Sequence, residues 1–259
     1  MILVTGGTGT LGRAVVRRAR AAGTAVRVLS RRPGPDDTVV GDLTTGAGLA
    51  AALHGVGTVI HCATDPRASG ADVRAAEQLL AIARDGRPHL VYISIVGVDR
   101  IPLRYYREKL AVERFIEESG APWTILRTTQ FHELVWELLR RLARFPVVPA
   151  PSGTSVQPID VDAAAVRLLE LAAGRPARRV PDLGGPQVRT AADLARSYLR
   201  HIGSRRPVFP VPFPGRIAAA YRQGFHLAPQ HPAGGRSWEE FLAGEREGEG
   251  QDGRRTGGA

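Results

Sequence analysis

The chain has 259 residues, of which 43% are hydrophobic and 23% charged, and this ordinary globular composition excludes wholesale disorder. The formal net charge is +10, but the arginines are scattered along the chain without a recognition motif, so no nucleic-acid partner is expected. A single Cys excludes a disulfide framework and a cysteine-cluster metal site, and no apolar run approaches the roughly 18 residues of a membrane span, so we expect no metal and a cytoplasmic protein without membrane contact.

Strand and helix signals alternate along the first half of the chain. In order, we expect a strand over 2–5, a helix over 11–22, strands over 26–29 and 39–40, a helix over 49–53, a strand over 58–62, a helix over 72–83, a strand over 90–94, a helix over 105–119 and a strand over 123–127. This spacing predicts βαβ units in an α/β fold: a Rossmann-type, doubly wound parallel sheet.

The second half is less regular. Helices are predicted over 131–145, 162–173, 191–202, 215–224 and 238–242, with a Pro/Ser-rich connection over 147–158. The proline-rich stretch 207–214 is not a central strand, because proline removes ladder donors. We therefore divide the chain into a core (1–128), a small C-terminal substrate lobe (129–243, with segments near 158–185 returning to the core) and a disordered tail (244–259).

A glycine-rich turn follows the first strand and opens the first helix. Gly6, Gly9 and Gly12 form GxxGxxG, and Gly7, Gly9 and Gly12 also satisfy GxGxxG. Small residues at these positions permit a tight turn and let the backbone approach a pyrophosphate, which the free N–H groups of the helix then bind. A strand before the turn and a helix after it favour dinucleotide binding over a plain glycine turn.

The end of the second strand bears on the choice of cofactor. NAD-preferring folds place an acid roughly 20 residues after the turn, to hold the ribose hydroxyls. This chain instead has Arg31 and Arg32, and a guanidinium can bind a 2′-phosphate in a bidentate manner. The chemistry favours NADP(H) over NAD(H); the alternative is that both arginines are merely solvated.

Residues at the ends of later strands complete the predicted cofactor edge. Asp42 precedes Leu43 and can accept from an adenine amino group or cap the next helix, and Ala63 and Thr64 follow the fourth strand. His61 is expected to pack rather than to bind a metal, as is the neighbouring Cys62.

Ser94, Tyr105 and Lys109 form a third group of candidate site residues, after the glycine turn and the residues at the strand ends. The YxxxK spacing places Tyr105 and Lys109 on one face of a helix, and Lys109 is the only lysine of the chain. An adjacent ammonium is expected to stabilise a tyrosine phenolate, and Ser94 can bind the reacting oxygen. Tyr106, three residues before Lys109, is the competing phenol.

The glycine turn, the residues at the strand ends and the Ser94, Tyr105 and Lys109 group occur in this order along the chain. In this they resemble the short-chain dehydrogenase/reductases, and in particular their atypical NmrA-like branch of NAD(P)-binding proteins. The resemblance covers residues 1–175 and implies a Rossmann core with a small substrate lobe. It implies a catalytic role for Tyr105, Lys109 and Ser94 and substrate contacts for Gln130, Phe131 and His132. The cofactor contacts that it implies, or that the turn itself predicts, are Gly6, Thr8, Gly9, Thr10, Leu11, Gly12, Arg31, Arg32, Asp42, Leu43, Ala63, Thr64 and Lys109.

The predicted function is therefore an NAD(P)H-dependent oxidoreductase that acts by hydride transfer on a small, hydrophobic, carbonyl or quinone-like substrate. Two alternatives stay open: a nucleotide-sugar epimerase or dehydratase with tightly held cofactor, and a non-catalytic NmrA-like sensor of NADP(H). The residues leave the substrate open, as they do the reaction direction and the choice between monomer and homodimer.

Overall fold

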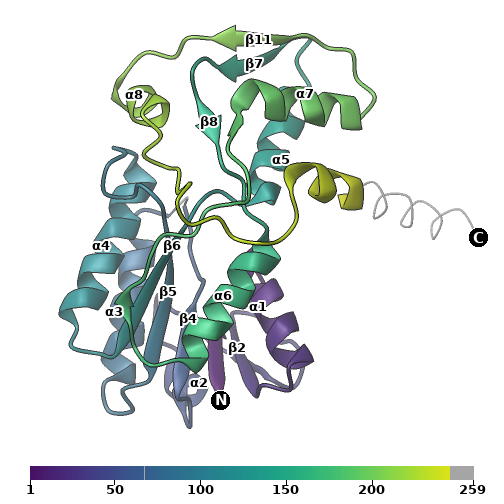
Figure 1. The fold of residues 1–259 in the computed structure, drawn as a ribbon. Helices are drawn as coiled ribbons and strands as arrows, with labels where there is room; N and C mark the ends of the chain where they lie inside the picture. The colour runs from purple at the N-terminus through teal and green to yellow at the C-terminus, as the bar shows by residue number, and fades with distance from the viewer. Residues whose placement is uncertain (67, 246–259) are drawn as a thin grey trace, which may run out of the picture. The chain divides into compact units, whose positions relative to one another are not determined.

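The computed structural model describes residues 1–66 and 68–245 and divides into two compact units (Figure 1). The N-terminal unit comprises residues 1–128 and 161–183, and the C-terminal unit comprises 129–160 and the described residues from 184 onward. Of the predicted tail, residues 244–245 are helical and residues 246–259 lie outside the described residues. Within the described ranges, no helix is both long and apolar enough to cross a bilayer.

The N-terminal unit is built on a seven-stranded parallel sheet. Its strands are β1 (Ile2–Thr5), β2 (Val26–Ser30), β3 (Thr38–Val40), β4 (Thr58–His61), β5 (His89–Ile95), β6 (Trp123–Thr128) and β9 (Arg178–Arg179). The order across the sheet is β3-β2-β1-β4-β5-β6-β9, and every neighbouring pair is parallel. The direction of winding therefore reverses between β1 and β4, where open α/β sheets bind ligands at the carboxyl ends of the strands.

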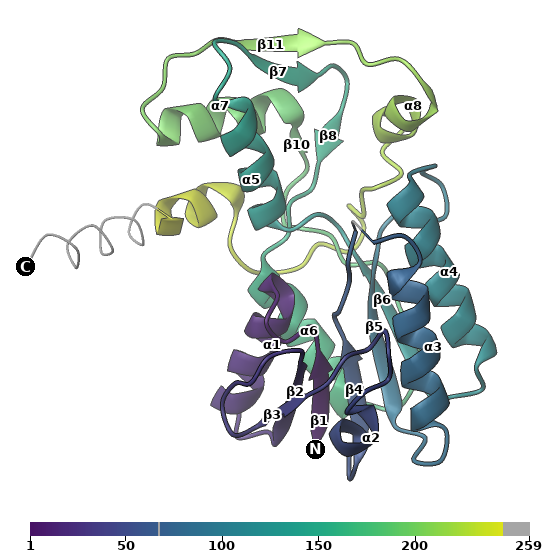
Figure 2. The same cartoon turned by 180° about the vertical axis from the view of Figure 1, so that it is seen from behind.

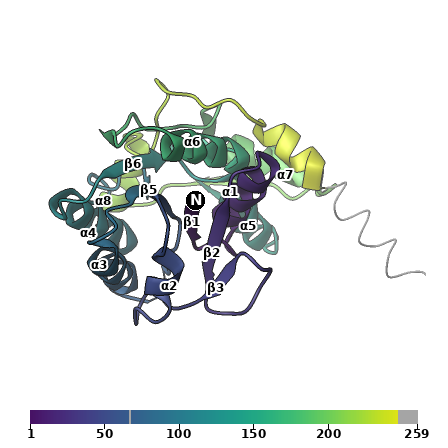
Figure 3. The same ribbon diagram turned by 90° about the horizontal axis from the view of Figure 1, so that it is seen from below.

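Helices cover both faces of this sheet, as the predicted alternation requires (Figure 3). Helices α1 (Thr10–Ala21) and α6 (Val161–Ala173) pack together on one face. The helices on the other face are α2 (Leu49–Leu53), α3 (Ala71–Ala83) and α4 (Arg104–Glu118).

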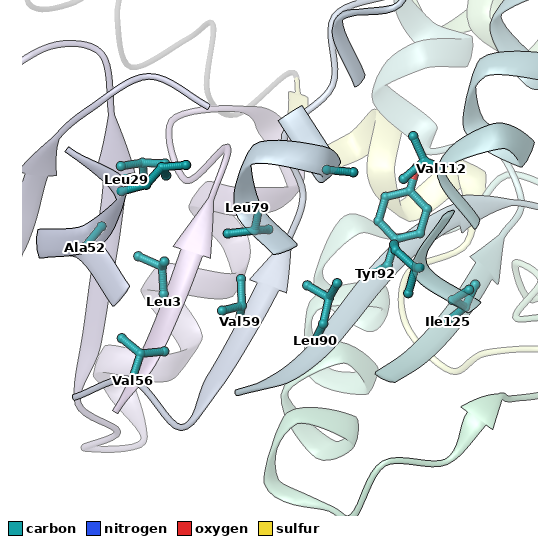
Figure 4. Close-up of a cluster of buried hydrophobic side chains, with 13 residues drawn as sticks. Leu3, Leu29, Ala52, Val56, Val59, Leu79, Leu90, Tyr92, Val112 and Ile125 are labelled. Atoms are coloured by element: carbon teal, nitrogen blue, oxygen red, sulfur yellow. The ribbon is translucent and has the colours of Figure 1, made fainter. Parts of the chain in front are cut away.

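The main core lies beneath α2, α3 and α4 (Figure 4). Alternate strand residues such as Leu3, Val59 and Leu90 meet the inner faces of the helices, where Leu79 and Val112 are buried. Burial of a side chain of this size contributes about 1.5–3 kcal/mol, so this cluster fixes the positions of the strand ends.

The C-terminal unit combines short helices with two small sheets (Figure 2). Strands β7 (Val148–Pro151) and β11 (Val208–Val211) form a parallel pair, and β8 (Ser155–Val156) and β10 (Arg189–Thr190) form an antiparallel pair. The labelled helices are α5 (His132–Leu142), α7 (Ala191–His201) and α8 (Arg216–Arg222), and a further helix covers residues 238–245. Trp238 and Phe241 from that last helix pack into a core with Leu139, Leu194 and Tyr198.

The Pro/Ser-rich connection over 147–158 contains two short strands, β7 and β8, which the sequence did not indicate. Pro149 and Pro151 are tolerated in β7 because its sheet has only two strands, so each strand has a free edge. The proline-rich stretch 207–214 likewise forms an edge strand, β11, and no central one.

Candidate functional site

The glycine turn between β1 and α1 is packed too closely to hold side chains. A Cβ placed on Gly12 would overlap the carbonyl oxygen of Gly6, and one on Gly6 would lie 2.6 Å from the Ala63 nitrogen. Gly6 also has a φ of +67°, which favours glycine. The turn thus brings α1 close to the sheet, at the point where β1 and β4 end.

The N-terminus of α1 has the features of an anion site. Gly9 is the N-cap, no side chain accepts from the first turn, and that turn contains no acidic residue. The turn is held instead by backbone hydrogen bonds from Gly9 to Gly6 and from Arg13 to Gly9. Free N–H groups and the helix dipole together favour a bound phosphate at this position.

Arg31 and Arg32 follow β2 at the same edge of the sheet and are exposed. Within the described residues, neither guanidinium has a recorded hydrogen bond or ion pair. Arg31 lies near enough to Asp42 to contribute to the lowering of its carboxyl pKa, although hydrogen bonds from Thr44 are the main cause. The two arginines are therefore available to a phosphate.

The Asp42 side chain stabilises the loop that contains it and does not cap α2. Its Oδ1 accepts from the Thr44 backbone nitrogen at 2.7 Å and from the Thr44 hydroxyl at 2.6 Å. Helix α2 has Gly48 as its N-cap and no side-chain cap. Leu43 packs against the main core, so it is held beside the loop that Asp42 stabilises.

Thr64 joins the end of β4 to the predicted catalytic helix. Its Oγ1 lies 2.9 Å from the Tyr105 hydroxyl and donates to Asp72 Oδ2 at 2.5 Å. Asp72 is 4% exposed, and its other oxygen accepts from the Asp65 backbone nitrogen at 2.8 Å. The sequence indicated Thr64 and Tyr105 separately, but gave no signal for Asp72, which occupies an ordinary first-turn position of α3.

Lys109 is buried, with 3% of its surface exposed. Its Nζ donates to the Ile93 carbonyl oxygen at 2.9 Å and lies 4.3 Å from the centre of the Tyr92 ring. Burial lowers its pKa to about 8, an effect that Asp72, Cys62 and Glu113 oppose. The sequence predicted that Lys109 shares a helix face with Tyr105, and in the structure the Lys109 ammonium is held by the Ile93 carbonyl of β5.

Stabilisation of a Tyr105 phenolate by Lys109 stays a prediction. In this structure burial raises the Tyr105 pKa, Asp72 and Glu108 raise it further, and the hydrogen bond with Thr64 lowers it. The Lys109 ammonium donates to the Ile93 carbonyl instead. The competing phenol, Tyr106, is buried at 6% exposure, whereas Tyr105 is half-buried.

Ser94 lies on β5, two residues after Tyr92 and therefore on the same side of the strand. Its Oγ is buried and has no hydrogen-bond partner within the described residues, and the same holds for the Tyr92 hydroxyl. Leaving such a group unsatisfied costs about 1–3 kcal/mol. Ser94 is thus free to bind an oxygen of a ligand.

His61 and Cys62 behave as packing residues, as the sequence indicated. Burial lowers the His61 pKa to about 4, and its ring stacks on Tyr92 with centroids 5.5 Å apart. Burial also raises the Cys62 pKa to about 12, so the thiol is a poor nucleophile. Among the described residues, no group of His, Cys, Asp and Glu side chains is arranged to hold a metal.

The three residues predicted to contact substrate belong to the C-terminal unit. His132 is 1% exposed, donates from Nε2 to the Arg236 carbonyl at 2.9 Å and stacks on Phe241. Phe131 is the N-cap of α5. Both polar atoms of the Gln130 side chain are buried without a partner in the described part of the chain, so Gln130 has the greatest capacity of the three to bind a ligand.

Comparison with known proteins gives consistent matches. Residues 6–170 match the model of the NAD(P)H-binding family. A (4-alkanoyl-5-oxo-2,5-dihydrofuran-3-yl)methyl phosphate reductase of Streptomyces griseus is 34% identical over 216 residues, covering 78% of this chain and 74% of the reductase.

Solved structures with the same fold include reductases and epimerases. An NADPH-dependent quinone oxidoreductase of Escherichia coli, solved with NADPH, has a TM-score of 0.78 at 17% identity and covers 95% of this chain and 100% of its own. The UDP-glucose 4-epimerase of Thermus thermophilus, solved with NAD, has a TM-score of 0.67 at 18% identity and covers 89% of this chain and 98% of its own. At these identities the likeness shows the fold alone.

The matched family and the sheet order agree with the resemblance found in the sequence. The family model spans more than half of the chain and includes the glycine turn, Ser94, Tyr105 and Lys109. Together with the reductase relative, it supports an NAD(P)-dependent oxidoreductase of the short-chain dehydrogenase/reductase type. The chain belongs to the NAD(P)H-binding family.

Proposed function

We propose that this protein is an NADPH-dependent oxidoreductase that reduces a small, hydrophobic, carbonyl or quinone-like substrate. The observation that carries the proposal is the uncapped glycine turn at α1, which lies in the same unit as the Thr64–Tyr105 contact and the unpartnered Ser94 hydroxyl. The reductase relative and the family match support the same class of reaction.

The residues present fit a dinucleotide phosphate. A Cβ on Gly12 would overlap the Gly6 carbonyl, so glycine is needed here for α1 to pack this closely on the turn. The uncapped N-terminus of α1 then leaves backbone N–H groups for a pyrophosphate. The free guanidiniums of Arg31 and Arg32 would hold a 2′-phosphate, which favours NADPH over NADH. Thr8, Thr10, Leu11, Asp42, Leu43 and Ala63 would border the rest of the cofactor.

The bound cofactor would supply a hydride. Tyr105 would donate a proton to the substrate oxygen, and the Ser94 hydroxyl would hold that oxygen by a hydrogen bond. Lys109 would keep its bond to the Ile93 carbonyl and direct its remaining donors toward the cofactor edge. In the C-terminal unit, Gln130 is our candidate for contact with a polar group of the substrate, because its side-chain amide has no partner within the described residues.

The relative from Streptomyces griseus reduces an alkanoyl furanone methyl phosphate, which combines an apolar chain with a phosphate. We infer that carbonyl compounds with an apolar chain, with and without a phosphate group, are the substrates to test first.

Titration with NADPH and NADH, followed by the fluorescence of the reduced nicotinamide, tests the cofactor assignment. Tighter binding of NADPH is the expected result, and a preference for NADH would overturn the role given to Arg31. A panel of quinones and alkyl carbonyl compounds should then oxidise NADPH with wild-type protein and much more slowly with Tyr105→Phe. Equal turnover by both proteins would remove Tyr105 from the mechanism.

The same measurements separate the two alternatives. NADPH binding without turnover of any panel member would favour a sensor. Cofactor that stays with the protein through purification, combined with turnover of a nucleotide sugar, would favour an epimerase. The epimerase structures that share this fold make that second outcome worth measuring.

A further inference from the structure

We propose that Asp72, acting through Thr64, is a positioning residue that fixes the Tyr105 hydroxyl and keeps it protonated. The inference rests on the proposed role of Tyr105 as proton donor and goes beyond it, because it assigns control of the Tyr105 ionisation to a residue on another helix. Asp72 lies on α3 and Tyr105 on α4, and Thr64 in the loop after β4 connects them.

The hydrogen bonds define which atom holds each proton. In its carboxylate form Asp72 has only acceptors, so the Thr64 hydroxyl donates its single proton to Asp72 Oδ2. The Thr64 oxygen is then left to accept, and the contact of 2.9 Å with Tyr105 must use the phenol proton. Tyr105 is therefore held as a protonated donor by a chain that ends on a buried carboxylate.

Loss of the Tyr105 proton is opposed in two ways. Thr64 can turn its proton toward a phenolate only by giving up its bond to Asp72, which is 4% exposed and then loses one of its two recorded donors. The phenolate would also lie close to the Asp72 carboxylate, and like charges disfavour each other. The groups that interact with Tyr105 further include Glu108 on its own helix and Tyr92 on β5, and neither supplies a positive charge.

The hydrogen-bond chain sets the state in which Tyr105 waits for substrate. To act as proton donor, the Tyr105 hydroxyl must exchange its bond to the Thr64 oxygen for one to the carbonyl oxygen of the substrate. It then gives its proton to that oxygen while the carbonyl carbon gains the hydride, so C=O becomes CH–OH and the phenolate takes a proton back from water. Because Asp72 and Thr64 disfavour the phenolate, they keep Tyr105 in its protonated form until substrate is bound.

The ionisation of Tyr105 can be measured without any substrate. The full chain is labelled with 3-fluorotyrosine, whose phenol is a stronger acid than that of tyrosine, and each of the five tyrosines then gives a fluorine NMR signal that is followed against pH. Tyr105→Phe assigns the signal. Asp72→Asn keeps the size of the side chain and removes its charge, and the Tyr105 midpoint should fall by about one pH unit.

Two comparisons isolate the path through Thr64. Glu77→Gln removes an exposed charge from the same helix α3 and should leave the midpoint unchanged. In a Thr64→Val background, Asp72→Asn should shift the midpoint less, because only the through-space charge remains, whereas Thr64→Ser should restore the full shift. If Asp72→Asn does not fold, Asp72→Ser replaces it, since serine is tolerated near a helix N-terminus.

An unchanged or higher midpoint in Asp72→Asn would overturn the proposal, and equal shifts in the wild-type and Thr64→Val backgrounds would remove Thr64 from it. These outcomes are separate from the fate of the proposed function, because the titration needs neither cofactor nor substrate. If the protein fails to bind NADPH while the midpoint moves as expected, the oxidoreductase assignment fails and the positioning of Tyr105 by Asp72 stands.

Discussion

The Lys109 ammonium donates a hydrogen bond to the Ile93 carbonyl oxygen at 2.9 Å, and this contact ties the only lysine of the chain to the central strand β5. A flexible side chain with a compact charge can reach this buried carbonyl beside the Tyr92 ring, and the planar fork of an arginine suits the position poorly. In a chain whose other basic residues are all arginines, the position of Lys109 explains the exception.

The burial of Lys109 predicts a pH-dependent contribution to stability. Below its native pKa of about 8, the native and unfolded chains both carry the proton, so the cost of burying the charge is fully present. Between about 8 and the ordinary value of 10.5, the unfolded chain binds more protons than the native one, so this contribution to the free energy of unfolding rises with pH.

Lys109→Met removes the buried charge and should raise the free energy of unfolding at pH 7 by about 1–3 kcal/mol, while NADPH turnover is lost. The gain should shrink at pH 9.5, where the wild-type lysine is largely neutral. Urea unfolding at the two pH values measures both effects, and Arg107→Met on the exposed face of α4 is the matched control. This account of Lys109 would be contradicted if the stability that Lys109→Met gains over wild type were smaller at pH 7 than at pH 9.5.

Much of the N-terminal unit could be predicted from the sequence because its signals are local. Buried parallel strands are continuous apolar runs such as 2–5 and 123–127, and glycines mark the ends of the helices. The predicted helix over 49–53 coincides with α2. Thr190 caps α7 by accepting from the Asp193 nitrogen, which is typical of a threonine at a helix N-cap.

The features that the sequence did not indicate depend on contacts between distant residues. Strand β7 contains Pro149 and Pro151, and only its pairing with β11, which lies far along the chain, makes it a strand. Tyr105 and Thr64 are 41 residues apart, and no periodicity connects them. The direction of the Lys109 side chain likewise depends on the β5 carbonyl that faces α4. Residue spacing alone does not define that carbonyl.

Gly12→Ala should destabilise the protein and abolish cofactor binding. The added methyl group meets backbone of the Gly6 peptide rather than a movable side chain, so α1 must shift away from β1. We expect a loss of about 1–3 kcal/mol in the free energy of unfolding, together with loss of NADPH binding. Gly57→Ala is the control, because a Cβ there meets nothing within 4 Å. Normal NADPH binding by Gly12→Ala would argue against a pyrophosphate at this turn.

Arg31→Ala should weaken the binding of NADPH and leave that of NADH nearly unchanged, because only NADPH carries a 2′-phosphate. The loss of charged hydrogen bonds worth about 1.5–3 kcal/mol corresponds to a change of about 10- to 100-fold in Kd. Arg84→Ala, an exposed arginine at the end of α3, should change neither value. If Arg31→Ala weakened both cofactors equally, Arg31 would be acting on a group that they share.

A buried ion pair beneath the Tyr105 helix supplies the last prediction. Glu113 on α4 is fully buried and accepts from Arg127 Nε at 2.9 Å, from Arg127 Nη2 at 2.7 Å and from Arg179 at 3.0 Å. Arg127 is itself 5% exposed, and its other recorded partner is Asp99 at 3.1 Å. The pair fixes α4 against β6 and β9, and so holds the helix that carries Tyr105 and Lys109.

Glu113→Gln keeps the shape of this side chain but leaves the Arg127 charge without its buried partner, and should cost about 3–5 kcal/mol in the free energy of unfolding. Glu117→Gln is the matched control, because Glu117 lies one turn further along α4, pairs with Arg179 at 2.7 Å and is 33% exposed at its side chain. An exposed pair of this kind contributes about 0–1 kcal/mol, so urea unfolding should separate the two variants clearly. If Glu113→Gln cost as little free energy of unfolding as Glu117→Gln, Arg127 would have found a substitute partner, and the position of α4 would not depend on this pair.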